Sequence, residues 1–231
     1  MQIEPIAYFR SPFGTKFGIP RQAGLAEDVE GRIVFEPACR NRDAIRGLEG
    51  FDYIWLIWEF SANGRKDNSF QATVRPPRLG GNERIGVFAS RSPFRPNRLG
   101  LSSVRIKRVE LESFGPDGKN EGPVVIVSGA DLMDGTPIYD IKPYVTYADS
   151  HPDARSGFVD SNAWEKLEVV FTEGLDLSFP EETALRQVLE QDPRPQFQDD
   201  PGKVYGMLYD GRDIRFMVKG KTLTVIETKK L

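Results

Sequence analysis

The stretch FDYIWLIWEF, residues 51–60, carries the strongest fold signal in the chain. Its bulky aromatic and aliphatic side chains predict a strand that is buried on both faces. The apolar part of the stretch, from Tyr53 to Trp58, is far shorter than the ~20 residues that a membrane helix needs. The stretch therefore indicates a strand in the core of a soluble protein, and no membrane partner is expected.

Further strands are expected on both sides of this stretch, separated by turns in a chain with 22 Gly and 17 Pro. A short helix is predicted over residues 41–48, with Asn41 as its N-cap. The strands follow one another closely and lack the strand–helix–strand rhythm of a doubly wound sheet. We therefore expect a mainly β fold, a barrel or curled sheet, whose other strands fall at residues 2–10, 31–35, 85–89, 103–111 and 124–128.

A second, smaller unit is expected over residues 151–231, after a barrel domain over residues 1–150. Its clearest element is a helix over residues 178–191, in which Ser178 and Glu181 fit a capping box. Three strands follow at residues 204–209, 213–218 and 222–228, and Asp210-Gly211 is a typical hairpin turn between the first two. These elements predict a small α+β domain with a helix and a three-strand meander.

The scarcity of cysteine and histidine limits the chemistry that the chain can perform. Its 231 residues include one cysteine, Cys39, and one histidine, His151. A Cys/His zinc cluster is therefore excluded, and no metal is expected. Ser-His-Asp or Cys-His catalysis would depend on His151, which lies in a loop-like stretch. A single cysteine cannot form an intramolecular disulfide, and the first residues lack the pattern of a signal peptide, so we expect a cytoplasmic protein.

The positive charge is concentrated in one window of a chain whose formal net charge is -3. Residues 71–108 contain nine basic residues and one acid, Glu83. Such a window is either a solvated basic face or a site for an anion. We favour an anion site, because Arg91, Arg95 and Arg98 lie among Pro, Gly and Asn in a loop, and arginine binds phosphate or carboxylate with two parallel hydrogen bonds. Phe88 and Phe94 flank this loop, and we expect them in the core rather than stacked on a base.

A second stretch rich in functional groups runs over residues 131–144. Asp134-Gly135 is a good turn pair. Asp140 lies between Tyr139 and Ile141 in a segment that is typical of a strand. An acid in that position is either paired with an arginine or poised for proton transfer, and the sequence leaves both interpretations open.

The glycine-rich residues 79–86 match neither a phosphate-binding loop nor a dinucleotide fingerprint, and they indicate a tight turn before a strand. The residues alone thus predict an anion-binding β protein and do not give a reaction. A noncatalytic RNA- or anion-binding module is the alternative to an enzyme.

Five blocks of the chain, taken in order, resemble the TsaA/TrmO (YaeB-like) family. They begin with Pro20-Arg21-Gln22-Ala23-Gly24-Leu25 and continue through residues 46–51, 75–82 and 86–97 to Asp134-Gly135-Thr136-Pro137 with residues 140–144. The C-terminal segment with residues 191–195 is also similar to that of bacterial members. Five ordered blocks are far more specific than a lone glycine motif.

This resemblance implies a function and a set of partners. It implies a homodimeric methyltransferase with a β-barrel fold that uses S-adenosylmethionine as cofactor and tRNA as substrate. The implied acceptor is N6 of N6-threonylcarbamoyladenosine, the nucleoside 3′ to the anticodon, in tRNA-Thr.

The resemblance also nominates residues for the site. Asp140 and Tyr139 are the catalytic candidates, and Asp140 either accepts the N6 proton or orders the site. Family members commonly have a histidine at the position of Ser61, where this chain has serine. The cofactor contacts carry over to Arg21, Gln22, Ala23, Ser61, Ala62, Arg91, Leu101, Thr136, Pro137, Ile138 and Tyr139. The arginines assigned to tRNA are Arg75, Arg78, Arg84, Arg95 and Arg98. Arg95 or Arg98 is expected to bind the threonyl carboxylate.

Overall fold

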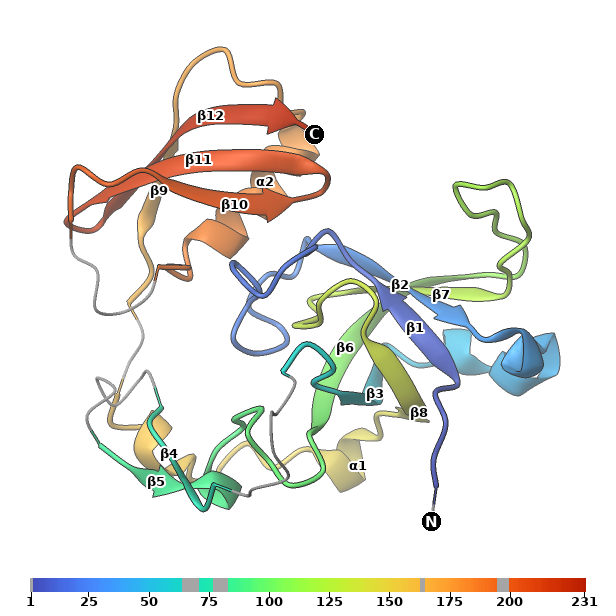
Figure 1. The fold of residues 1–231 in the computed structure, drawn as a ribbon. Coiled ribbons are helices and arrows are strands. Elements are labelled where there is room, and N and C mark those ends of the chain that lie inside the picture. Colours follow the sequence, from blue (N-terminus) through green and yellow to red (C-terminus); the bar gives the residue numbers. More distant parts are fainter. Residues whose placement is uncertain (1, 64–70, 77–82, 163–164, 195–199) are drawn as a thin grey trace.

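The computed structural model of the protein describes residues 2–63, 71–76, 83–162, 165–194 and 200–231. Most of its strands belong to a barrel and to a smaller sheet near the C-terminus (Figure 1). The barrel strands are antiparallel to their neighbours and close in the order β1-β2-β7-β6-β3-β8. They are β1 (Ala7–Arg10), β2 (Glu30–Phe35), β3 (Tyr53–Glu59), β6 (Leu99–Glu110), β7 (Val124–Ser128) and β8 (Pro137–Pro143). The predicted mainly β barrel is therefore confirmed.

The β3 strand corrects one prediction from the sequence. Ile54, Leu56 and Trp58 face the barrel interior and are buried. Trp55 and Ile57, which alternate with them, are only partly buried. Burial on both faces was the wrong prediction, because alternate side chains of a barrel strand face the interior and the outer wall.

The interior face of β3 requires a glycine on its partner strand. Trp58 pairs with Gly100 of β6, and a Cβ atom added at Gly100 would lie 2.3 Å from the Trp58 ring. The edge of the ring also meets Phe60, with the two centroids 4.3 Å apart. The small residue at Gly100 thus makes room for the indole inside the barrel.

The predicted helix over residues 41–48 forms as two 3-10 turns, η2 (Arg42–Ile45) and η3 (Leu48–Gly50). They follow another short turn, η1 (Pro37–Cys39). The Asn41 side chain accepts a hydrogen bond from the Asp43 N–H, which confirms it as the N-cap. Gly47, at φ 87°, interrupts the helix because this left-handed backbone cannot continue a right-handed turn.

The basic window forms less regular structure than expected. Strands β4 (Thr73–Val74) and β5 (Ile85–Gly86) pair with each other, and a 3-10 turn, η5 (Val87–Ala89), follows. The strand predicted over residues 85–89 is therefore too long. Two further short helices, α1 (Thr146–Asp149) and η6 (Gly157–Val159), come after the barrel.

The C-terminal module contains one helix and a sheet in the order β10-β11-β12-β9. Its elements are β9 (Glu168–Phe171), α2 (Phe179–Leu189), β10 (Tyr205–Tyr209), β11 (Arg212–Lys219) and β12 (Thr222–Lys230). The capping box of Ser178 and Glu181 is present, and Asp210 and Gly211 have the positive φ values of the expected hairpin turn. The predicted meander is thus present, and β9 joins it as a fourth strand, parallel to β12, that the sequence did not predict.

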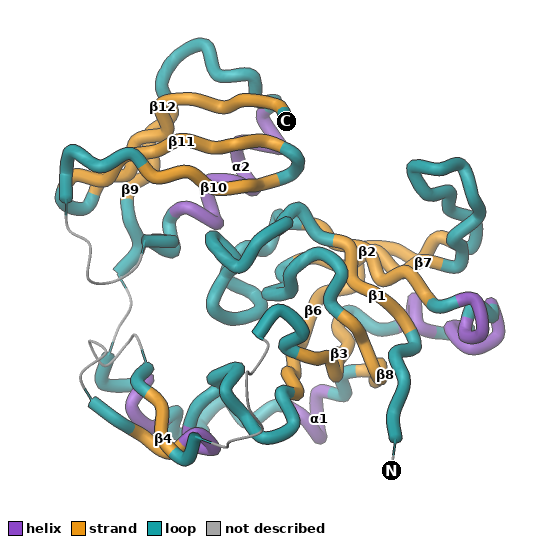
Figure 2. Tube along the Cα trace, viewed as in Figure 1, coloured by secondary structure: helices purple, strands orange, loops and turns teal. Residues whose placement is uncertain are grey.

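The loop after β1 packs the barrel against the C-terminal module. Phe13, Ala26 and Val29 belong to the same core cluster as the α2 side chains of the C-terminal module. The Gln187 side chain of α2 donates to the Asp28 carboxylate and accepts from the Asp28 N–H, at 2.8 and 2.9 Å. In Figure 2 this loop lies between the barrel and the C-terminal sheet. Within the described residues, no helix combines the length and the apolar character needed to cross a membrane.

Candidate functional site

A β-bulge in β8 places the two catalytic candidates together. Asp140 pairs with Ile57, whereas Ile138 pairs with Trp58, so that Tyr139 is an extra residue in β8. Ile138 and Ile141 lie opposite the inward-facing Trp58 and Leu56. Because both residues between them point away from the interior, Tyr139 and Asp140 share the outer wall of the barrel. Bulges are common beside active sites, where they redirect a side chain in this way.

Tyr139 belongs to a polar cluster with Glu59 and Arg98, which we call the outer-wall cluster. The Tyr139 hydroxyl donates to Glu59 Oε2 at 2.6 Å, and Arg98 Nη2 lies 2.8 Å from Glu59 Oε1. Burial, followed by the hydrogen bond to Glu59, raises the pKa of Tyr139 to about 12. The phenol is therefore protonated near neutral pH, and it can donate a hydrogen bond but cannot act as a base.

Glu59 is the member of this cluster that the sequence did not single out. It is the last residue of β3 and directly follows Trp58. A carboxylate at the end of an otherwise apolar strand was the signal that could have found it. Arg98 itself has a positive φ of 50°, which bends the chain as it enters β6.

The Asp140 carboxylate is half-exposed, and its partner among the described residues is a lysine instead of the arginine that one interpretation expected. Lys142 Nζ lies 2.9 Å from Asp140 Oδ2, and the Ile141 N–H donates to Asp140 Oδ1 at 2.9 Å. Within the described residues β8 supplies this partner itself, because Lys142 lies two residues along the same face of the strand. Proton transfer remains the open interpretation for Asp140.

The cofactor contacts predicted in the first loop lie at the rim of the barrel. Arg91 Nη1 donates to Gln22 Oε1 at 2.5 Å, so the two predicted contacts are adjacent. The backbone N–H of Ala23 donates to the Asp131 carboxyl group. Arg21 Nη2 donates to the carbonyl of Asp192 at 3.4 Å, beside a hollow of about 220 Å³ between this loop and the C-terminal module.

An interior network, consisting of Trp58, Ser102 and Asp131, begins on the inner face of β3. Trp58 Nε1 donates to Ser102 Oγ at 3.0 Å, and Ser102 Oγ donates to Asp131 Oδ1 at 2.6 Å. Burial raises the pKa of the Asp131 carboxyl, and the hydrogen bonds that it accepts lower it in part. Asp131 lies three residues after the end of β7. This sequence position alone did not distinguish it from the other acids nearby.

The remaining predicted cofactor contacts differ in accessibility. Leu101 is 54% exposed on the outer wall, and Ser61 and Ala62 are exposed just after β3. Thr136 and Ile138, in contrast, are buried, and their carbonyls accept hydrogen bonds from Phe9 and Ile6. Pro137 between them is also buried. Residues 136–138 can therefore reach a ligand only through a small part of their surface.

The arginines assigned to tRNA fall into two groups, and Arg78 lies outside the described residues. Arg75 and Arg84 are exposed, and Arg84 donates to the Thr73 hydroxyl. Arg95 donates to the carbonyls of Ser90 and Val87, and Arg98 pairs with Glu59. Arg95 and Arg98 thus already have partners within the protein, which limits their capacity for a substrate carboxylate.

The loop that contains Arg91, Arg95 and Arg98 is called the arginine loop below. Its aromatic side chains are not in the core. Phe88 is 71% exposed and Phe94 is 49% exposed, which makes the predicted core position wrong. The Arg95 guanidinium lies 5.9 Å from the centre of the Phe88 ring. The loop therefore presents aromatic and cationic groups on one surface.

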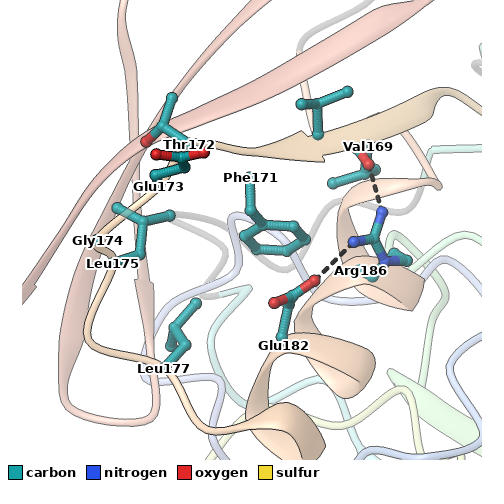
Figure 3. A pocket seen from close by; sticks show the side chains of 10 residues that line it. Val169, Phe171, Thr172, Glu173, Gly174, Leu175, Leu177, Glu182 and Arg186 are labelled. Carbon is teal, nitrogen blue, oxygen red and sulfur yellow. Dashed lines mark hydrogen bonds and ion pairs between the residues drawn. The ribbon is translucent and has the colours of Figure 1, made fainter.

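A hollow of about 480 Å³ in the C-terminal module contains none of the predicted site residues (Figure 3). Arg186 lies in it, paired with Glu182 and hydrogen-bonded to the Val169 carbonyl, and its guanidinium stands over the Phe171 ring. These contacts satisfy the arginine internally. In the part of the chain that the structure describes, no group of three or more His, Cys, Asp or Glu side chains is placed to hold a metal ion.

The fold and the site define a class: a closed antiparallel barrel with an arginine-lined rim and a charged cluster on its outer wall. Comparison with known proteins identifies the family. Residues 8–150 match the model of the tRNA-methyltransferase O N-terminal domain, and residues 165–231 match that of the TrmO C-terminal domain. The chain therefore belongs to the TrmO family of tRNA adenine-N6 methyltransferases, which confirms the resemblance seen in the sequence.

Individual relatives support this membership over nearly the whole chain. The tRNA (adenine(37)-N6)-methyltransferase of Escherichia coli K12 is 37% identical over 227 residues, which cover 94% of this chain and 93% of the relative. A putative S-adenosylmethionine-dependent methyltransferase, RcsF, of Pseudomonas aeruginosa is 40% identical over 89% of this chain and 87% of its own. The crystal structure of TrmO from Pseudomonas aeruginosa has a TM-score of 0.77 and 31% identity, covering 99% of this chain and 97% of that chain.

Proposed function

We propose that the protein transfers a methyl group from S-adenosylmethionine to N6 of N6-threonylcarbamoyladenosine at position 37 of tRNA-Thr. The observation that carries this proposal is the β-bulge, which puts Tyr139 and Asp140 side by side on the outer wall. Family membership and the names of the relatives support the tRNA substrate and the position within it. The threonylcarbamoyl group and the tRNA species come from the sequence resemblance described above.

The donor set of the site suits S-adenosylmethionine. The cofactor carries a carboxylate, a sulfonium cation and an adenine, and when bound it supplies the methyl group. The exposed Arg91, oriented by Gln22, is suited to the carboxylate. The Glu59 carboxylate favours a cation nearby, and the exposed Leu101 offers an apolar surface to the adenine.

The chain's own residues would then hold the acceptor and its proton. Methyl transfer to N6 releases the N6 proton, and we assign its acceptance to the Asp140 carboxylate, which is half-exposed beside Tyr139. Tyr139, protonated and bonded to Glu59, serves as a hydrogen-bond donor. Because the reaction needs no covalent intermediate, positioning supplies much of the acceleration.

The proposal includes tRNA binding, a homodimer and a cytoplasmic location. Arg75 and Arg84 are exposed and suited to phosphate, and the exposed Phe88 ring, near the Arg95 guanidinium, is suited to stacking. The outer wall and its surroundings also expose large apolar side chains, which supports a contact with a second copy. These side chains are Phe51, Tyr53 and Tyr147.

A nucleoside mass-spectrometry assay tests the proposed function. The protein and S-adenosylmethionine would be mixed with tRNA-Thr purified with and without its threonylcarbamoyl group. We expect a mass gain of one methyl on the modified nucleoside alone. A gain on plain adenosine would keep the methyltransferase and discard the substrate. No gain on either tRNA, with tRNA still bound and no S-adenosylmethionine binding in a calorimeter, would favour the noncatalytic RNA-binding module instead.

A further inference from the structure

The Asp131 carboxyl group is surrounded by hydrogen-bond donors. Trp58 Nε1 can only donate, so it occupies a lone pair of Ser102 Oγ and leaves the hydroxyl proton for Asp131 Oδ1. The Ala23 N–H and the backbone N–H of Asp131 itself also bond to the carboxyl. The Arg91 guanidinium adds an electrostatic attraction from the side of the arginine loop.

These contacts converge on segments that are distant in sequence. Ala23 belongs to the loop after β1, Arg91 to the arginine loop, and Ser102 to β6 next to Leu101. A backbone hydrogen bond from the Gly24 N–H to the Gly129 carbonyl, at 2.8 Å, holds the loop after β1 against the segment that carries Asp131. Arg91 in turn bonds to Gln22. One carboxyl group thus links three of the predicted cofactor contacts, Gln22, Ala23 and Arg91.

We propose that Asp131 is a positioning residue of the cofactor site, which fixes residues 22–23 and Arg91 in the arrangement that binds S-adenosylmethionine. This inference rests on the proposed function. Asp131 acts through Ala23 and Arg91, and its own role does not require contact with the reacting atoms. Trp58 and Ser102 orient the carboxyl from inside the barrel.

The carboxylate is the side chain that this environment requires. Each group around it is a donor or a cation, so an acceptor on both oxygens satisfies all of them. Asparagine would keep one acceptor but turn an NH₂ group toward donors and remove the attraction for Arg91. A conservative exchange of Asp131 for asparagine should therefore loosen the loop without changing the size of the side chain.

The test compares Asp131→Asn with Ser102→Ala and with a control. For Asp131→Asn we expect the Kd and KM for S-adenosylmethionine to rise about tenfold or more, as typical for hydrogen bonds to a charged group. The KM for tRNA and kcat at saturating cofactor should change less than about twofold. Ser102→Ala should raise the same cofactor constants by a smaller factor, because the Ala23 and Arg91 contacts remain. Glu121→Gln is the control, since it removes a carboxylate paired with Arg32 on the β6–β7 connection.

The outcomes separate this inference from the proposed function. If the wild-type protein binds no S-adenosylmethionine, the proposed function fails. If it binds, and Asp131→Asn binds equally well, the positioning role is wrong. A parallel loss of kcat, tRNA KM and cofactor KM would indicate a general structural defect and also overturn the inference. Should Asp131→Asn not fold, Ser102→Ala decides alone: an unchanged cofactor KM contradicts the role.

Discussion

The two faces of β3 support different polar structures that start at adjacent residues. Trp58 begins the interior network with Ser102 and Asp131, whereas Glu59 begins the outer-wall cluster with Tyr139 and Arg98. Trp58 and Ser102 of the interior network are buried, Asp131 is partly buried, and the donors converge on the Asp131 carboxyl group. The outer-wall cluster is partly exposed and lies beside the Asp140 carboxylate. If the proposed roles hold, the alternation of one strand separates the groups that position the cofactor site from those that take part in the methyl transfer.

Removing the carboxylate of Asp140, the proposed proton acceptor on the outer wall, should have the largest effect on activity. Asp140→Asn is expected to lower kcat about a hundredfold or more, because general-base catalysis typically contributes that much. The Kd for S-adenosylmethionine should stay unchanged, and calorimetry with single-turnover assays measures both. Asp117→Asn is the control, because Asp117 is exposed on the connection between β6 and β7 and pairs with Lys119. Full turnover in Asp140→Asn would assign the proton to another group.

Adding a methyl group at Gly100, on the interior face of the barrel, should lower the stability of the fold. Gly100→Ala would place a Cβ atom 2.3 Å from the Trp58 ring, and such overpacking typically lowers the free energy of unfolding by about 1–3 kcal/mol. Gly86→Ala is the matched control, because nothing lies within 4 Å of its Cβ position and its φ is -59°. Urea unfolding of both variants measures the difference. Equal stability would mean that Trp58 moves freely inside the barrel.

Breaking the outer-wall cluster should change the titration of Tyr139 and lower activity about tenfold. Burial and, after it, the hydrogen bond and charge of Glu59 raise the pKa of Tyr139 to about 12, so Glu59→Gln is expected to lower this pKa while the contribution of burial remains. Ultraviolet titration against a Tyr139→Phe variant isolates this phenol. An unchanged titration would show that burial alone sets the pKa.

The smallest effect is expected from an arginine that belongs neither to the interior network nor to the outer-wall cluster. Arg75 is exposed, and Arg75→Ala should weaken tRNA binding about twofold at physiological salt and reduce the slope of log K against log salt by about 0.7–0.9. Binding of modified and unmodified tRNA should weaken equally, since a phosphate contact carries no base information. A loss confined to the modified tRNA would place Arg75 at the nucleoside instead.

Local patterns made much of the fold predictable. The capping box at Ser178, the hairpin turn at Asp210-Gly211 and the strand at residues 124–128 are confirmed with their positions. Each depends on side chains within a few residues of one another. The strand β9 was missed, because its parallel pairing with β12 depends on residues more than 50 positions away.

The candidate site was predictable in composition but not in arrangement. The sequence nominated Tyr139, Asp140 and the arginine loop, and the structure brings Arg98 to Tyr139 through Glu59. It could not show that Arg95 is bonded to backbone carbonyls or that Phe88 is exposed. Those facts depend on loop conformation, which the residue types alone leave open.

By itself the sequence determined a mainly β chain with a basic, arginine-rich window, one histidine and the ordered motifs of its family, because these are properties of composition and short-range pattern. Only the tertiary structure decided which side of the wall each group occupies. The bulge at Tyr139 and the approach of Asp131 to Ala23 and Ser102 both follow from the register in which distant strands pair. A shift of one residue in that register exchanges interior and exterior, and no local signal records it.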